Sequence, residues 1–307
     1  MRRRVRLLAA TATAVAMLTS CSSPGADDPG DVRTKVQDVA SPPGGVERYA
    51  ALGDSFTAGP LIPTTDLASG CFRSDHNYPA LVAERLDVSQ VRDVSCSGAD
   101  TTDLTDRQQT VRGASVPPQL RAVTPVTDLV TLGIGGNDFG LFGTLVSTCA
   151  QVGQQDSTGS PCADTLRARG VDLVGEAREI SGRVEDAVRE VRQRAPRATV
   201  VLVGYLRLVP SSGRCRGLPF ARGDYAFGDR VTRGLNDALA RAARRTGARF
   251  VDMYSASKGH DVCSRDPWVN GARTEEGKAL AFHPLAEGME AVADRVVKTL
   301  SRGGPGS

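Results

Sequence analysis

The feature that most constrains the fold of this chain is a regular alternation of short strand-like runs with longer helix-like runs. Five short apolar runs have the length and composition of buried strands. Four longer stretches are expected to be helices, and one of them, 171–195, repeats apolar residues three or four positions apart, as one face of a helix does. The alternation predicts an α/β fold, a three-layer α/β/α sandwich around a mostly parallel five-stranded sheet. The expected strands are 48–52, 91–95, 128–133, 199–204 and 249–254, and the expected helices are 77–86, 171–195, 227–246 and 284–300.

In such a sheet, ligands bind beyond the carboxyl ends of the strands. The first expected strand is followed by Gly53-Asp54-Ser55, which places a serine at a strand-to-helix turn. Backbone N–H groups at a helix start favour developing negative charge. Taken alone, this serine could equally be a helix N-cap after a tight turn. Gly98 follows the second strand, where a glycine lets the backbone approach a ligand or simply makes a turn.

The third strand ends in a glycine-rich turn, 133–136, followed by Asn137 and Asp138. No lysine follows, so the turn does not fit a phosphate-binding loop. The chain has three histidines. His283, before Pro284, lies just before the last expected helix, on the edge of the sheet that carries these turns. His76 and His260 are expected in surface or packing positions, too scattered for a metal site.

The four segments together resemble the blocks of the GDSL/SGNH hydrolase family, in family order and over residues 48–300. The resemblance implies a flavodoxin-like catalytic domain that hydrolyses carboxylic esters without a cofactor or metal. It implies that Ser55 is the nucleophile and His283 its general base and acid. The oxyanion hole would comprise the Ser55 and Gly98 N–H groups and the Asn137 side-chain amide.

Two positions depart from the family pattern. The acid that commonly stands three residues before the histidine is here Leu280, and Leu285 replaces an asparagine that often follows His-Pro. We expect the Leu280 carbonyl to orient His283 in a Ser-His dyad. Asp261 and Asp266 are the alternative acids, and we rank them below the carbonyl. The change at Leu285 should affect local structure more than chemistry.

Seven cysteines are present, and Cys21 follows the expected export signal described below. The other six allow 15 pairings, among which sequence alone does not choose. No Cys-x-x-Cys pair suggests zinc, and no histidine motif accompanies a thiol nucleophile. The simplest proposal pairs them sequentially, as Cys71–Cys96, Cys149–Cys162 and Cys215–Cys263. The secreted actinobacterial esterase/lipase branch of the family, which the Trp268-Val269 segment also resembles, has this pairing.

The N-terminus reads as an export signal over residues 1–20. Four arginines precede an apolar run at 7–18, which is shorter than the about 20 residues that span a membrane. The sequence 18–21 resembles a bacterial lipobox, which would make Cys21 the lipidated residue of a cell-surface lipoprotein. A plain secretory signal is the alternative. Residues 21–45 have the composition of a tether, 46–302 form one catalytic domain, and 303–307 are a tail.

Charge and loop composition bear on partners. The formal charge is +3, and beyond residue 20 it is −1, from 34 Lys and Arg against 35 Asp and Glu, so no nucleic-acid partner is expected. We expect a monomer. The loops expected at 139–170, 205–226 and 255–282 would shape an acyl pocket, and the first opens with an apolar group that favours lipid or fatty-acyl esters. This group is Phe139, Leu141, Phe142 and Leu145.

Two other functions fit parts of the sequence. A catalytically silent cell-surface binding protein on the same fold would explain the missing acid, although the other blocks are intact. A polysaccharide O-acetyl esterase would need aromatic sugar platforms, and aromatic residues make up only 5% of the chain.

Overall fold

The computed structural model describes residues 45–302 of the protein. The expected signal peptide (1–20) with Cys21, the tether except for its last residue, and the tail (303–307) lie outside the described residues. The expected five-stranded sheet is present, and all its pairings are parallel. The strand order is β4-β1-β7-β8-β9, which is the flavodoxin-like order. The strands are β1 (Arg48–Gly53), β4 (Gln90–Asp93), β7 (Leu129–Gly133), β8 (Thr199–Val203) and β9 (Arg249–Val251).

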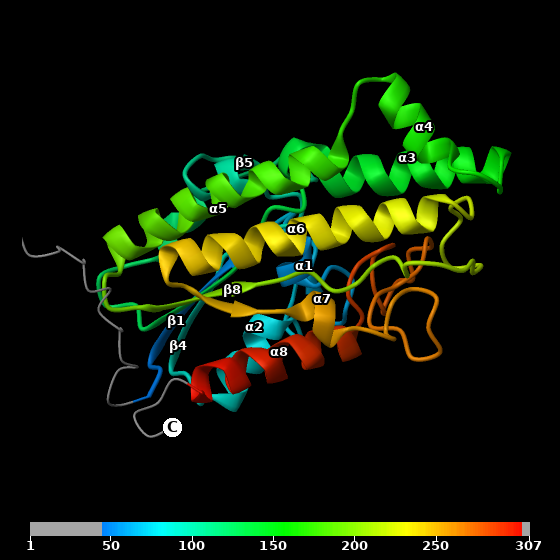
Figure 1. The fold of residues 1–307 in the computed structure, drawn as a ribbon. Coiled ribbons are helices and arrows are strands. Elements are labelled where there is room, and N and C mark those ends of the chain that lie inside the picture. Colours follow the sequence, from blue (N-terminus) through cyan, green and yellow to red (C-terminus); the bar gives the residue numbers. More distant parts are fainter. Residues whose placement is uncertain (1–44, 303–307) are drawn as a thin grey trace, which may run out of the picture. The chain divides into compact units, whose positions relative to one another are not determined.

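Helices cover both faces of the sheet, as the three-layer prediction requires. Figure 1 shows α5 (Leu173–Arg194) and α6 (Asp224–Thr246) side by side on one face, with α2 (Tyr78–Arg85) and α8 (Ala286–Ser301) on the other. The central strands β7 and β8 are buried along their whole length, which explains their continuous apolar sequences. The edge strand β4 is mostly exposed.

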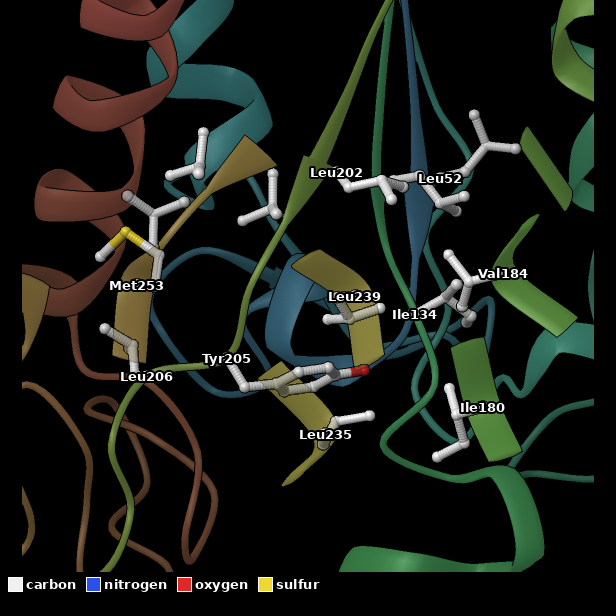
Figure 2. Packing of buried hydrophobic residues seen from close by; sticks show 14 of the residues in the cluster. Leu52, Ile134, Ile180, Val184, Leu202, Tyr205, Leu206, Leu235, Leu239 and Met253 are labelled. Atoms are coloured by element: carbon white, nitrogen blue, oxygen red, sulfur yellow. The ribbon is translucent and has the colours of Figure 1, made fainter. Parts of the chain in front are cut away.

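Apolar side chains at regular spacing pack α5 and α6 against the sheet. Figure 2 shows Ile180 and Val184 of α5, and Leu235 and Leu239 of α6, among the buried side chains around Leu202 of β8. Residues four apart lie on the same face of a helix, so each pair forms one contact with the core. The same spacing predicted α5 from sequence.

The prediction of a loop at 139–170 is wrong. The segment forms α3 (Leu141–Gln155) and α4 (Pro161–Ala168), which the Cys149–Cys162 disulfide links. Leu141, Leu145 and Cys149 follow one another at four-residue intervals and are buried, so a helical signal was present. Two of the residues expected to shape an acyl pocket, Leu141 and Leu145, therefore belong to the core.

The structure ends the last strand at Val251, three residues earlier than expected, because Asp252 caps a helical turn there.

The remaining elements are short. They are α1 (Ser55–Ala58), α7 (Met253–Ala256), the 3-10 turns η1 (Thr101–Leu104), η2 (Gln119–Ala122) and η3 (Asp138–Gly140), and the strand pairs β2 (Thr65–Asp66) with β3 (Arg73–Ser74) and β5 (Gln108–Gln109) with β6 (Ser115–Val116).

The six cysteines of the domain pair in the sequential order expected: Cys71–Cys96, Cys149–Cys162 and Cys215–Cys263. Disulfides of this number fit an oxidising, extracellular compartment. No helix within residues 45–302 combines the length and apolarity needed to span a bilayer.

Two helical glycines should respond in opposite ways to alanine. A Cβ on Gly153 of α3 would lie 2.4 Å from the Pro219 carbonyl oxygen, whereas one on the exposed Gly182 of α5 meets nothing within 4 Å. We expect Gly153→Ala to lower the free energy of unfolding by about 1–3 kcal/mol. Gly182→Ala should raise it by about 0.5–1 kcal/mol, because alanine is the better helix former. Urea denaturation followed by circular dichroism measures both, and equal effects would contradict the packing described here.

Candidate active site

The four sequence blocks meet at the carboxyl edge of the sheet. β1 lies between β4 and β7, and the chain leaves β1 toward one side of the sheet and β7 toward the other. This switch point is where open α/β sheets bind ligands. Ser55 is the first residue of α1, directly after β1, and Asn137 lies four residues beyond β7. The chain thus brings together segments far apart in sequence.

Ser55 and His283 form a hydrogen-bonded pair. The His283 Nε2 atom lies 2.8 Å from the Ser55 Oγ atom. The other ring nitrogen, Nδ1, lies 2.7 Å from the Ala281 carbonyl oxygen. A carbonyl oxygen only accepts, so Nδ1 carries the proton and Nε2 presents its lone pair to the serine hydroxyl. This is the tautomer that a general base requires.

The expectation that the Leu280 carbonyl orients His283 is wrong by one residue. The Leu280 carbonyl instead accepts the backbone N–H of His283 (3.2 Å) and the side-chain amide of Asn270 (3.3 Å). Phe282, between Ala281 and His283, has a left-handed backbone (φ 61°). This tight turn directs the Ala281 carbonyl toward the ring, a detail of backbone geometry that the residue types alone do not specify.

The two alternative acids do not contact His283. Asp261 accepts the Cys263 N–H (2.9 Å), and a carboxylate oxygen of Asp266 lies 3.3 Å from Nδ1 of His260. His260 stacks on Trp268 with ring centroids 3.9 Å apart, and His76 is exposed, 2.6 Å from Asp75. Both of these histidines therefore have the packing or surface positions expected of them. His283 is oriented by a backbone carbonyl and not by an acid.

The segment that carries His283 is fastened to residues 268–271. Asn270 N–H donates to the His283 carbonyl (2.8 Å), Phe282 N–H to Gly271 (3.0 Å), and Leu285 N–H to Trp268 (2.9 Å). Asn270 is buried, and its side-chain amide reaches the Ala279 carbonyl at 3.0 Å. Sequence reasoning did not identify Asn270. Leu285 precedes α8 without a side-chain cap and is itself buried, so its effect is on local structure.

The candidate oxyanion groups lie on two adjoining turns. The Asn137 side-chain amide donates to the Ala99 carbonyl at 2.8 Å, which fixes it against the turn that holds Gly98. Within residues 45–302, the backbone N–H groups of Ser55 and Gly98 donate to no protein acceptor. Asp138 is fully buried and accepts from Thr101 and, at 3.0 Å, from Arg183. The hydrogen bonds of Asp138 therefore stabilise the turn that carries Asn137.

A chain of buried, hydrogen-bonded polar groups next to Ser55 was not predicted from the sequence. The Gly136 N–H donates to the Tyr205 hydroxyl (2.7 Å), which in turn donates to the Asp54 carboxylate. The other Asp54 oxygen accepts the Phe56 N–H at 2.8 Å and so caps α1. Burial raises the pKa of Asp54 to about 7. The chain links the turn after β1, which bears Ser55, to the turn after β7, which bears Asn137.

The protonation of His283 suits a base. Burial lowers the pKa of its imidazole to about 4, and the Ala281 carbonyl only partly opposes this shift. The ring is therefore neutral at pH 7. Among the described residues, no group of three or more His, Cys, Asp or Glu side chains is arranged to hold a metal ion.

This geometry can be set beside known proteins. The model of the GDSL-like lipase/acylhydrolase family matches residues 51–291. The chain belongs to this family. Carboxylic-ester hydrolysis, which the sequence predicted, is therefore its activity. Gly53, Ser55, Gly98, Asn137 and His283 all lie within the matched region.

Relatives of known sequence or structure agree over most of the domain. Lipase 2 of Streptomyces coelicolor is 37% identical over 82% of this chain and 85% of its own. The lipase of Streptomyces rimosus is 31% identical over 78% and 81%. The crystal structure of phospholipase A1 from Streptomyces albidoflavus aligns with a TM-score of 0.67 at 29% identity, covering 83% of this chain and 99% of that one. The fold class expected for the family is confirmed.

The pH profile should report the low pKa of His283. We expect kcat/KM to stay near its maximum between pH 8 and pH 5 and to fall as pH drops through about 4, where the imidazole becomes protonated. Initial rates on a p-nitrophenyl ester across this range measure the profile. Because Asp54 also titrates, the Asp54→Asn variant serves as the control. An acid limb at pH 6–7 that persists in this variant would contradict the assignment.

Removing the Tyr205 hydroxyl should slow turnover without weakening substrate binding. In Tyr205→Phe, Asp54 and the Gly136 N–H lose their shared partner, and the two turns are free to shift. A displacement near 1 Å can cost up to about 10²-fold, so we expect kcat to fall about tenfold or more with KM unchanged. Tyr254→Phe is the matched control, since its hydroxyl also donates to a buried carboxylate, Asp229, away from the site. Equal kcat values in the two variants would reduce Tyr205 to a stabilising role.

Proposed function

We propose that the protein hydrolyses lipid or fatty-acyl esters with a Ser55–His283 dyad, through an acyl-enzyme intermediate. The observation that carries this proposal is the 2.8 Å contact between Ser55 Oγ and His283 Nε2, with Nδ1–H donated to Ala281. The serine hydroxyl faces a neutral, correctly protonated base. This arrangement makes the serine a nucleophile without a carboxylate.

The reaction takes two steps. Ser55 Oγ attacks the ester carbonyl carbon while its proton passes to His283 Nε2. The tetrahedral intermediate collapses, the bond to the alcohol oxygen breaks, and the alcohol leaves with the proton from Nε2. Water then loses a proton to His283 Nε2 and attacks the acyl carbon. The bond between the acyl carbon and Ser55 Oγ breaks, Oγ takes the proton back from Nε2, and the acid is released. The Ala281 carbonyl stabilises the imidazolium of each step by accepting its Nδ1–H.

The negative charge of the intermediate would be held by the Ser55 N–H, the Gly98 N–H and the Asn137 side-chain amide. Three features support this assignment. The two backbone donors have no protein acceptor among the described residues, the Asn137 amide retains one unused hydrogen, and Ser55 lies at a helix start. Preorganised donors of this kind are worth about 10²–10³ each in kcat.

Apolar side chains near the dyad favour acyl substrates. The ring centroids of Phe56 and His283 lie 5.5 Å apart, and those of Phe56 and Phe142 lie 5.9 Å apart. Phe139, two residues after Asn137, is 40% exposed. Relatives named as lipases and phospholipase A1 support the same substrate class. The intact dyad and its carbonyl partner remove the main support for a silent binding protein, since the missing acid has a substitute.

The cellular location follows from the N-terminal sequence and the disulfides. We propose that residues 1–20 direct export and that Cys21 carries the lipid that anchors the protein at the cell surface. The three disulfides support an extracellular location, whichever way the protein is retained. The proposed molecule is a monomer with ester substrates and no nucleic-acid partner.

The test is hydrolysis of p-nitrophenyl esters of graded acyl length by the domain of residues 46–302. We expect Ser55→Ala and His283→Ala each to lower kcat/KM by about 10³-fold or more, because the two residues act as a unit. A rate that rises with acyl length would support the fatty-acyl assignment.

Two variants provide the controls. His76→Ala removes an exposed histidine, and Asp266→Asn removes one of the two alternative acids; both should retain activity within about twofold. Loss of a true triad acid lowers kcat by about 10⁴-fold. A large loss of activity in Asp266→Asn would therefore show that an acid assists His283, and it would refute the dyad. A folded wild type that is inert on every ester would favour the binding protein.

A further inference from the structure

A cavity adjoins the segment that carries His283. It has a volume of about 660 Å³ and is formed by the chain after β8, by the chain after β9, and by residues 269–273. Figure 1 shows that these loops gather beyond the same end of the sheet. Asn270 and Gly271 line the cavity, and their backbones bond to His283 and Phe282. Ser55 and His283 do not line it, so it is a neighbour of the dyad.

A close contact between two glycines builds one wall. A Cβ on Gly271 would lie 3.0 Å from the Gly217 carbonyl oxygen and 3.2 Å from its Cα, which is tighter than most Cβ contacts in proteins. The Ala272 N–H donates to the Gly217 carbonyl at 2.8 Å. Arg216 and Arg273 flank this bonded pair, and both line the cavity. Because this bond joins the two loops, both arginines lie beside it in the lining of the cavity.

The wall carries an excess of positive charge. Within residues 45–302, neither Arg216 nor Arg273 forms an ion pair or side-chain hydrogen bond. The one carboxylate of the lining, Glu275, pairs with Lys278 of the same lining at 3.1 Å. Positively charged side chains without a partner in the lining favour the binding of an anion. Guanidinium groups match phosphate in particular, because their N–H groups donate in parallel pairs.

We propose that this cavity binds a phosphate group, through Arg216 and Arg273, as the headgroup subsite of a phospholipid substrate. This inference rests on the proposed function, since a headgroup matters only if the dyad cleaves a lipid ester. Asn270 and Gly271, which line the subsite, bond to His283 and Phe282, so the headgroup and the ester would lie at the same edge of the sheet. Val262, Pro267 and Pro219 give the cavity an apolar component beside its charges.

The test compares two substrates with the same acyl chains in detergent micelles, phosphatidylglycerol and the neutral diacylglycerol. In the double variant Arg216→Gln/Arg273→Gln, we expect KM for phosphatidylglycerol to rise about tenfold or more, because charged hydrogen bonds are lost. KM for diacylglycerol should not change. Arg214→Gln is the matched control: it removes an arginine from the same loop, outside the lining. Equal changes on both substrates, or in both variants, would overturn the proposal.

A binding measurement separates the headgroup from free phosphate. Inorganic phosphate is titrated calorimetrically into Ser55→Ala, with and without the double substitution. Loss of phosphate binding in the double variant without a change in phospholipid KM would assign the site to a free anion and support the shared chemistry. No phosphate binding and no KM change would refute the site. Because this titration needs no turnover, it stands even if the ester-hydrolase proposal fails on p-nitrophenyl esters.

Discussion

The parallel pairing of β1 with β7 is the constraint on which the site depends. The pairing ends with Gly53 opposite Gly133, and there the Asp54 N–H donates to the Gly133 carbonyl at 3.0 Å. A Cβ on Gly53 would lie 2.2 Å from the Thr57 hydroxyl and 2.5 Å from the Gly133 carbonyl oxygen. Only glycine allows the two strands and α1 to approach so closely. This approach sets where Ser55 lies relative to the turn that holds Asn137.

The site works without the acid that the family commonly supplies because the imidazole is neutral. A carboxylate would stabilise the charged form of His283 and raise its pKa. A carbonyl fixes the tautomer but adds no charge, so burial dominates and the pKa falls to about 4. His283 is then neutral and able to accept a proton over a wide pH range. The imidazolium formed during the reaction is stabilised by the dipole of the Ala281 carbonyl and not by a charge. The Asp54 carboxylate nearby serves another purpose, since it holds the backbone of the two turns through Tyr205.

Much of the architecture was predictable because it depends on local patterns. The apolar runs of β1, β7 and β8 and the four-residue spacing of α5 and α6 report burial directly. The α3–α4 segment was missed, because it begins with the glycine-rich turn and Phe139, and its helical spacing was read as an apolar loop. The sequential disulfides agree with the expectation, since each pair closes a single stretch of chain between elements that are neighbours in the fold.

The sequence by itself determined the strand-and-helix order, the family, and the two residues that meet in the dyad. These follow from residue type and from position after a strand, both of which are written in the chain. Only the tertiary structure decided which carbonyl orients His283, that Tyr205 joins Asp54 to Gly136, and that Arg216 and Arg273 line one cavity. Tyr205 and Asp54 are 151 residues apart, and Ala281 differs from Leu280 only by the rotation of a tight turn. Such contacts depend on backbone geometry and on the packing of distant segments, and no local pattern of residues encodes either.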